Sequence, residues 1–179
     1  VPTSLLDECL PNDKKSKQEY LNFTSGLNQA TADYRVIKAI LSDNCPELLN
    51  SFSESLIGNP TQVFDFEKRR YSRSSLNYLL GLAALSKHTN LKKLTNILEI
   101  GGGFGTLGEI VASFLGPKVK YCNLDIAPIY EISKYYLENA LEDKQLILNN
   151  QLSEPISYNG GWNISVQPNC RIEEITGRV

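Results

Sequence analysis

The sequence is poor in the residue types that most often carry chemistry. Its 179 residues include no methionine, one histidine and four cysteines. No apolar run approaches the roughly 20 residues that a membrane-spanning helix needs, and no signal-peptide pattern occupies the N-terminus. The cysteines follow no metal-ligand spacing, so we expect reduced thiols and no metal site: Cys9, Cys45, Cys122 and Cys170. These absences predict a cytoplasmic protein without a membrane partner.

The sequence also lacks a large excess of either charge. It contains 18 Lys and Arg against 20 Asp and Glu, for a formal net charge of −2. Nucleic acid is therefore not an expected partner, because proteins that bind it usually present a basic surface. The hydrophobic content of 41% and charged content of 21% are typical of a globular domain with a core.

One segment is rich in glycine and is the most informative part of the chain. Residues 97–108 read Ile-Leu-Glu-Ile-Gly-Gly-Gly-Phe-Gly-Thr-Leu-Gly. The pattern predicts a short buried strand over Asn96–Ile100, then a helix that begins just after the glycines. Residues 118–124 form a second predicted strand, which is followed by Asp125. Glycines at a strand–helix turn let a ligand approach bare backbone, and an acidic side chain can hold ribose hydroxyls. The arrangement predicts a cofactor that contains a nucleoside.

Two cofactor motifs overlap in this segment. Gly103, Gly105 and Gly108 satisfy the Gly-x-Gly-x-x-Gly pattern of nicotinamide-dependent oxidoreductases. Glu99, Gly101, Gly103 and Gly105 satisfy Glu-x-Gly-x-Gly-x-Gly instead. Glu99 would repel the phosphates of a dinucleotide, but it suits the ammonium and sulfonium groups of S-adenosylmethionine. We therefore favour S-adenosylmethionine and keep the oxidoreductase as the alternative.

The second motif resembles motif I of the class I S-adenosylmethionine-dependent methyltransferases. More narrowly, the chain resembles the sugar O-methyltransferase family over about residues 57–141. The matching pieces are Ile-Gly-Asn-Pro at 57–60, residues 98–105, Leu-Asp-Ile-Ala-Pro at 124–128 and Tyr-Tyr-Leu at 135–137. The resemblance implies methyl transfer to a sugar hydroxyl in polysaccharide or natural-product biosynthesis. It also implies the cofactor-binding residues Glu99, Gly101, Gly102, Gly103, Phe104, Gly105, Asp125 and Ile126.

The predicted fold is α/β, with a Rossmann-like class I methyltransferase sheet behind an N-terminal helical region. Helical patterns at 13–23, 28–41, 46–57 and 72–87 indicate a helical cap over residues 1–95, and the cofactor-binding core occupies 96–179. A third short strand is expected at 145–149, after which too few residues remain for the seven strands that the resemblance implies. We therefore expect a truncated chain or missing segments after about residue 148, and a non-catalytic cofactor-binding domain is a further alternative.

The catalytic residues are not identified by the sequence. Methyl transfer to an alcohol needs a nearby base, and His88 is the only histidine. His88 falls at a predicted helix end, a position that equally suits a structural role. The expected partner is a small-molecule or saccharide acceptor, and the sequence leaves a homo-oligomer open.

Overall fold

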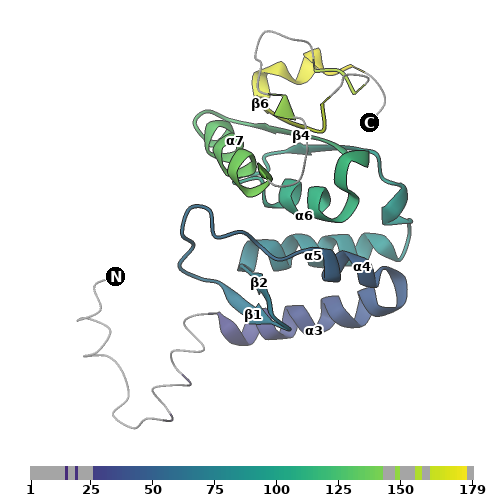
Figure 1. Ribbon diagram of the computed structural model, residues 1–179, viewed down its shortest axis with the longest axis vertical. Coiled ribbons are helices and arrows are strands. Elements are labelled where there is room, and N and C mark those ends of the chain that lie inside the picture. Colours follow the sequence, from purple (N-terminus) through teal and green to yellow (C-terminus); the bar gives the residue numbers. More distant parts are fainter. Residues whose placement is uncertain are drawn as a thin grey trace, which may run out of the picture.

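The structure is a computed structural model that describes residues 15, 19, 26–142, 148–149, 156–158 and 162–176. Figure 1 shows helices and a small hairpin at one end of the molecule and a sheet flanked by two helices at the other. No described helix is long and apolar enough to cross a membrane. The expected helix at 13–23 lies largely outside the described residues, and the residues after 176 lie wholly outside them.

Three helices form most of the N-terminal region. They are α3 (Leu27–Asn44), α4 (Pro46–Ser51) and α5 (Arg73–Ser86). Helices α3 and α5 lie on the predicted segments, whereas α4 ends six residues before the predicted end at 57. Helix α3 buries apolar residues every three or four positions and packs them against α5, as expected for an amphipathic helix.

A β-hairpin interrupts this helical region, so the prediction of helices alone is wrong here. Strands β1 (Phe64–Phe66) and β2 (Arg69–Tyr71) pair antiparallel around a two-residue turn of Glu67 and Lys68. Both turn residues have positive φ, at 50° and 66°. Hairpin turns of this kind usually contain Asn or Gly, so the sequence carries no recognisable turn pattern. The hairpin is held by packing instead: Phe66 stacks on Tyr34 of α3 with ring centroids 4.5 Å apart.

The remainder of the described chain is a parallel sheet with crossover helices. The strands are β3 (Asn96–Ile100), β4 (Lys120–Asp125), β5 (Leu148–Asn149) and β6 (Ile164–Pro168). Their order is β3-β4-β6-β5, and every pairing is parallel. Helix α6 (Thr106–Leu115) joins β3 to β4, and α7 (Ile129–Ala140) follows β4. The predicted α/β class, with a Rossmann-like sheet behind an N-terminal helical region, is confirmed.

The strand predictions near the glycines agree closely with the structure. Strand β3 has the predicted bounds, and β5 lies within the predicted 145–149 segment. Strand β4 begins at Lys120 instead of 118 because Gly116–Lys118 forms a short 3-10 turn. Strand β6 was not predicted, although its side chains are largely buried.

Strand β4 is the centre of the described sheet, and its alternating side chains serve two apolar layers. Tyr121 packs on the side of α6 and α7, with Val111 and Leu137. Cys122 and Leu124 pack on the opposite face, with Trp162. Because all strands are parallel, the carboxyl ends of β3 and β4 meet at one edge of the sheet. The glycine-rich segment and Asp125 are brought together at this edge.

Candidate functional site

Residues 101–105, here called the glycine turn, connect β3 to α6 at the carboxyl edge of the sheet. The Gly101 N–H donates to the Leu124 carbonyl at 2.7 Å, which ties the start of the turn to β4. Gly101, Gly103 and Gly105 have φ of 76°, 57° and 91°, a region that residues with a Cβ rarely adopt. Gly105 is the N-cap of α6 and supplies no side-chain cap. The first amides of α6 therefore receive no hydrogen bond from an N-cap side chain.

The glycines of this segment have two different functions in the structure. A Cβ on Gly102 would lie 2.6 Å from side-chain oxygens of Glu99 and Asn123, and one on Gly108 would lie 2.6 Å from the Tyr121 ring. A Cβ on Gly105 would lie 2.7 Å from Ser133. These three glycines are thus required for close packing of the turn and α6 on the sheet. No atom lies within 4 Å of a Cβ built on Gly103, so this glycine faces open space.

Asp125 stands directly beside the turn and is 8% exposed. Its Oδ2 accepts a hydrogen bond from the Gly103 N–H at 2.8 Å, and its Oδ1 accepts one from the Ile126 N–H at 2.7 Å. The carboxylate therefore braces the backbone of the glycine turn. Each carboxylate oxygen has a second lone pair, so the same side chain can also accept hydrogen bonds from a ligand.

Glu99 lies beneath the turn, where two tyrosines surround it. The Tyr121 hydroxyl donates a hydrogen bond to its Oε2. Burial, followed by the nearby Glu99 carboxylate, raises the pKa of Tyr78 on α5 to about 12. Both tyrosines therefore remain neutral donors at physiological pH. Glu99, which was predicted to lie near the cofactor, is thus half-buried beneath Gly102 and lies against Tyr121 of β4 and Tyr78 of α5.

Apolar side chains are exposed around the same edge of the sheet. Phe104 in the turn is 66% exposed, and Ile126 just after Asp125 is 57% exposed. Ile100, at the end of β3, is 63% exposed. Large apolar side chains gathered in one exposed place usually mark a binding surface. Phe104 and Ile126 are two of the residues that the sequence predicts to bind the cofactor.

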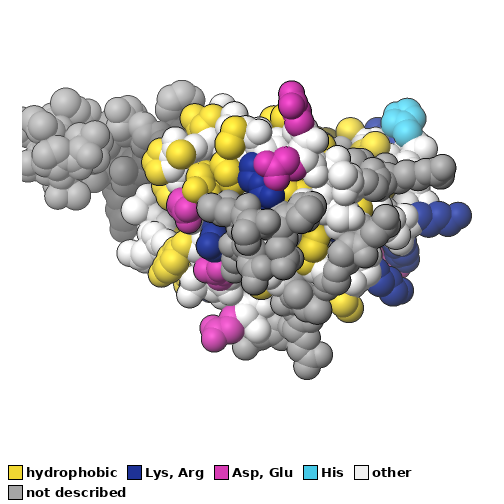
Figure 2. All heavy atoms as spheres, turned by 90° about the horizontal axis from the view of Figure 1, so that it is seen from above, with side chains coloured by type: hydrophobic (Ala, Val, Ile, Leu, Met, Phe, Trp, Pro, Cys, Tyr) yellow, Lys and Arg dark blue, Asp and Glu magenta, His cyan; other side chains and the backbone are white. Residues whose placement is uncertain are grey.

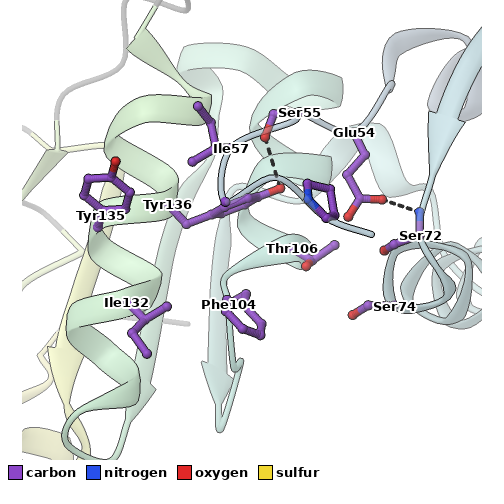
Figure 3. Close-up of a pocket in the computed structure, with 12 residues that line it drawn as sticks. Glu54, Ser55, Ile57, Ser72, Ser74, Phe104, Thr106, Ile132, Tyr135 and Tyr136 are labelled. Carbon is purple, nitrogen blue, oxygen red and sulfur yellow. Dashed lines mark hydrogen bonds between the residues drawn. The ribbon is translucent and has the colours of Figure 1, made fainter. Parts of the chain in front are cut away.

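A cavity of about 330 Å³ opens beside the glycine turn, between the N-terminal region and α7. We call it the turn pocket, and Figure 3 shows its lining residues. Its size lies within the range of small-molecule sites. The lining consists of Glu54, Ser55, Ile57, Gly58, Pro60, Ser72, Ser74, Phe104, Thr106, Ile132, Tyr135 and Tyr136. The pocket thus combines residues from segments more than 80 positions apart in the sequence.

One buried glutamate lines this pocket and a second is bonded to its lining residues, and the sequence prediction missed both. Glu54 lines the pocket, whereas Glu109 of α6 accepts a hydrogen bond from the Tyr136 hydroxyl at 2.6 Å and one from the Ser55 N–H at 2.9 Å. Burial, followed by the Glu109 carboxylate, raises the pKa of Tyr136. Neither glutamate belongs to a motif, and only the packing of distant segments places them here.

His88, the candidate base, lies away from the glycine turn. The pocket residue Ser74 lies in the first turn of α5. The helix has 14 residues and is therefore about 21 Å long. His88 follows the far end of α5 and lines a separate surface hollow that includes Asn44 and Lys92. Figure 2 shows the histidine side chain (cyan) at the outer surface. The structure thus separates His88 from the predicted cofactor residues.

The described residues show no pattern of a metal site. No group of three or more His, Cys, Asp or Glu side chains among the described residues is placed to hold a metal ion.

Comparison with known proteins adds a distant likeness to solved structures. No family model matches the sequence, and no curated protein matches it. A solved structure described as protein-L-isoaspartate O-methyltransferase is similar, with 16% sequence identity and a TM-score of 0.41. The similarity covers 82% of this chain and 52% of that chain, so this chain spans about half of its length. The resemblance to sugar O-methyltransferases stays a prediction.

Proposed function

We propose that this chain is an S-adenosylmethionine-dependent O-methyltransferase that acts in the cytoplasm on a sugar hydroxyl, in polysaccharide or natural-product biosynthesis. The observation that carries the proposal is the meeting of three features at one edge of the sheet. These are the glycine turn with Gly103 facing open space, the Asp125 carboxylate beside it, and the turn pocket that shares Phe104 and Thr106. Together they provide a backbone cradle, an acceptor for ribose hydroxyls and an adjoining cavity.

The charges around the site favour a cofactor without phosphates. Asp125 and Glu99 flank the glycine turn, and the described residues that line the turn pocket include Glu54 but no Lys, Arg or His. Carboxylates attract the ammonium and sulfonium groups of S-adenosylmethionine and repel a pyrophosphate. The same charges therefore disfavour the alternative, a nicotinamide-dependent oxidoreductase.

Each predicted cofactor residue has a physical part in this proposal. Gly101 and Gly103 would let the methionyl part approach the backbone, while Gly102 and Gly105 keep the turn packed on Glu99 and on α7. Asp125 would accept hydrogen bonds from the ribose hydroxyls. The exposed side chains of Phe104 and Ile126 would flank the apolar parts of the cofactor. When bound, the cofactor supplies an electrophilic methyl group on a sulfonium centre, and the protein contributes mainly alignment of the reactants.

The sugar acceptor is supported by the motif resemblance and by the side chains of the turn pocket. Phe104 and Tyr135 present exposed rings at its edge, 66% and 62% exposed, and Ile132 stands beside them. The C–H face of a sugar ring packs well on an aromatic ring, while its hydroxyls need polar partners of the kind that Ser74 and Thr106 offer.

Calorimetric titration of the purified chain with S-adenosylmethionine, S-adenosylhomocysteine and NAD tests the proposal. We expect binding of the first two and much weaker binding of NAD. Equal or tighter binding of NAD would favour the oxidoreductase. Binding of S-adenosylmethionine without methyl transfer to any acceptor would favour a non-catalytic cofactor-binding domain.

A further inference from the structure

Glu54 is a buried carboxylate that one wall of the turn pocket holds in place. It lies between α4 and β1 and is 6% exposed. Its Oε2 accepts hydrogen bonds from the Ser72 N–H and, at 2.7 Å, from the Ser75 hydroxyl. Ser72 is the N-cap of α5, so the partial positive charge of this helix end also faces the carboxylate. These contacts offset the cost of burying a charge and fix the orientation of the side chain.

The other carboxylate oxygen of Glu54 is left to the pocket. Both hydrogen bonds end on Oε2. The Oε1 atom accepts no bond from these two residues, and it is not one of the described polar atoms that are sealed from solvent without a partner. Figure 3 shows Glu54 and Thr106 at the same cavity, with the bond from Ser72 holding one side of the carboxylate. No ion pair found among the described residues includes Glu54. An oriented, unneutralised carboxylate oxygen therefore faces the space beside the glycine turn.

We propose that Glu54 is the general base of the reaction and that the turn pocket binds a neutral, hydroxyl-bearing acceptor. This inference depends on the proposed function. As the acceptor oxygen forms its bond to the methyl carbon, the carbon–sulfur bond breaks and its electron pair stays on sulfur. The hydroxyl proton passes to Oε1 of Glu54, which later releases it to solvent. An alcohol is a weak nucleophile at neutral pH, so a base within hydrogen-bond reach is what this chemistry requires.

The charge of the pocket determines the class of acceptor. Glu54 lines it, and Glu109 lies behind it with its carboxylate bonded to the lining residues Tyr136 and Ser55. Among the described residues, no Lys, Arg or His lines the pocket. The Glu54 carboxylate would repel a carboxylate or phosphate acceptor but not a neutral polyol, so the pocket favours a neutral acceptor.

The test compares Glu54→Gln and Glu54→Asp with the parent and with Glu47→Gln. Gln can still accept the bonds from Ser72 and Ser75, so the variant keeps its packing but cannot take a proton. Glu47 is an exposed glutamate of α4 that pairs with Lys92, which makes it a matched surface control. S-adenosylhomocysteine binding is measured by calorimetry. Methyl transfer is measured with a panel of methyl glycosides and, separately, with benzoate as a carboxylate probe.

We expect Glu54→Gln to bind S-adenosylhomocysteine within about twofold of the parent, which also shows that it is folded. Its methyl transfer to the glycosides should fall by about a hundredfold or more, the usual contribution of a general base. Glu54→Asp should fall less, Glu47→Gln should match the parent, and benzoate should not be methylated.

Four results would overturn the inference. They are turnover by Glu54→Gln near that of the parent, a tenfold loss of S-adenosylhomocysteine affinity in that variant, methylation of benzoate as fast as the glycosides, and a parent that binds cofactor but methylates no glycoside. The second result would assign Glu54 to the cofactor's ammonium instead. Failure of the proposed function is distinguishable, because the parent would then bind neither S-adenosylmethionine nor S-adenosylhomocysteine.

Discussion

Replacing Gly103 by Val tests whether the glycine turn receives a ligand or only makes a turn. Gly103 has φ of 57°, and no atom lies within 4 Å of a Cβ built on it. The Cβ of the new side chain would therefore meet no neighbouring element, and the strain would come from the positive φ. The side chain would instead fill the space above the turn, beside Asp125, where the cofactor is proposed to lie.

Gly103→Val should lower the free energy of unfolding modestly, because of the positive φ at this position. A left-handed conformation costs a residue with a Cβ about 1–2 kcal/mol. For a chain of this length each kcal/mol lowers Tm by about 2–4 °C, so Tm should fall by about 2–8 °C. The folded variant should lose at least about a hundredfold in cofactor affinity, about 2.8 kcal/mol, because a branched side chain in the cradle cannot move aside.

Gly116→Val is the matched control. Gly116 has φ of 60° and ψ of −145°, and it too has no atom within 4 Å of a built Cβ. It follows the opposite end of α6 from the glycine turn. Both variants should be destabilised, as measured by thermal circular dichroism, but only Gly103→Val should lose S-adenosylmethionine binding in calorimetry. Parent-like affinity in folded Gly103→Val would refute the proposed cradle, and equal losses in both variants would point to a general structural effect.

Three further substitutions test other parts of the site. Asp125→Ala should weaken S-adenosylmethionine binding by at least about tenfold, since charge-assisted hydrogen bonds contribute about 1.5–3 kcal/mol each. It should also lower Tm, because the Gly103 N–H loses its acceptor. Unchanged affinity in calorimetry would show that Asp125 does not bind the ribose. Gly108→Ala should cost about 1–3 kcal/mol in urea unfolding, because its Cβ would lie 2.6 Å from the Tyr121 ring, and an undiminished midpoint would contradict that packing. His88→Gln should leave methyl transfer unchanged, and a large loss of kcat would return His88 to the reaction.

The local pattern of the sequence was enough to predict the strand–turn–helix unit. Apolar and β-branched residues over Asn96–Ile100 gave the bounds of β3, and helical spacing after the glycines predicted α6. Asp125 was correctly placed at the end of the neighbouring strand. These features could be predicted because each depends on residues within about one turn or one strand of each other.

Features that depend on distant contacts could not be predicted in this way. The β1–β2 hairpin turns at Glu67 and Lys68, which have no intrinsic preference for positive φ, and its packing on α3 is what favours it. Asp125 was predicted to face a ligand, but its hydrogen bond from the Gly103 N–H, 22 positions away, was not predicted. Its position as a brace of the glycine turn is visible only in the folded chain.

The sequence by itself determined the fold class, the glycine turn and the acidic strand end, because local sterics and periodicity act on neighbouring residues. Only the tertiary structure decided which glycine is open and which ones are packed, and that Glu54 lies in the pocket while His88 does not. The physical reason is that an active site is an arrangement of groups in space. Glu54 carries no local pattern, and its role is set by the cap of α5, which holds one carboxylate oxygen and leaves the other facing the turn pocket.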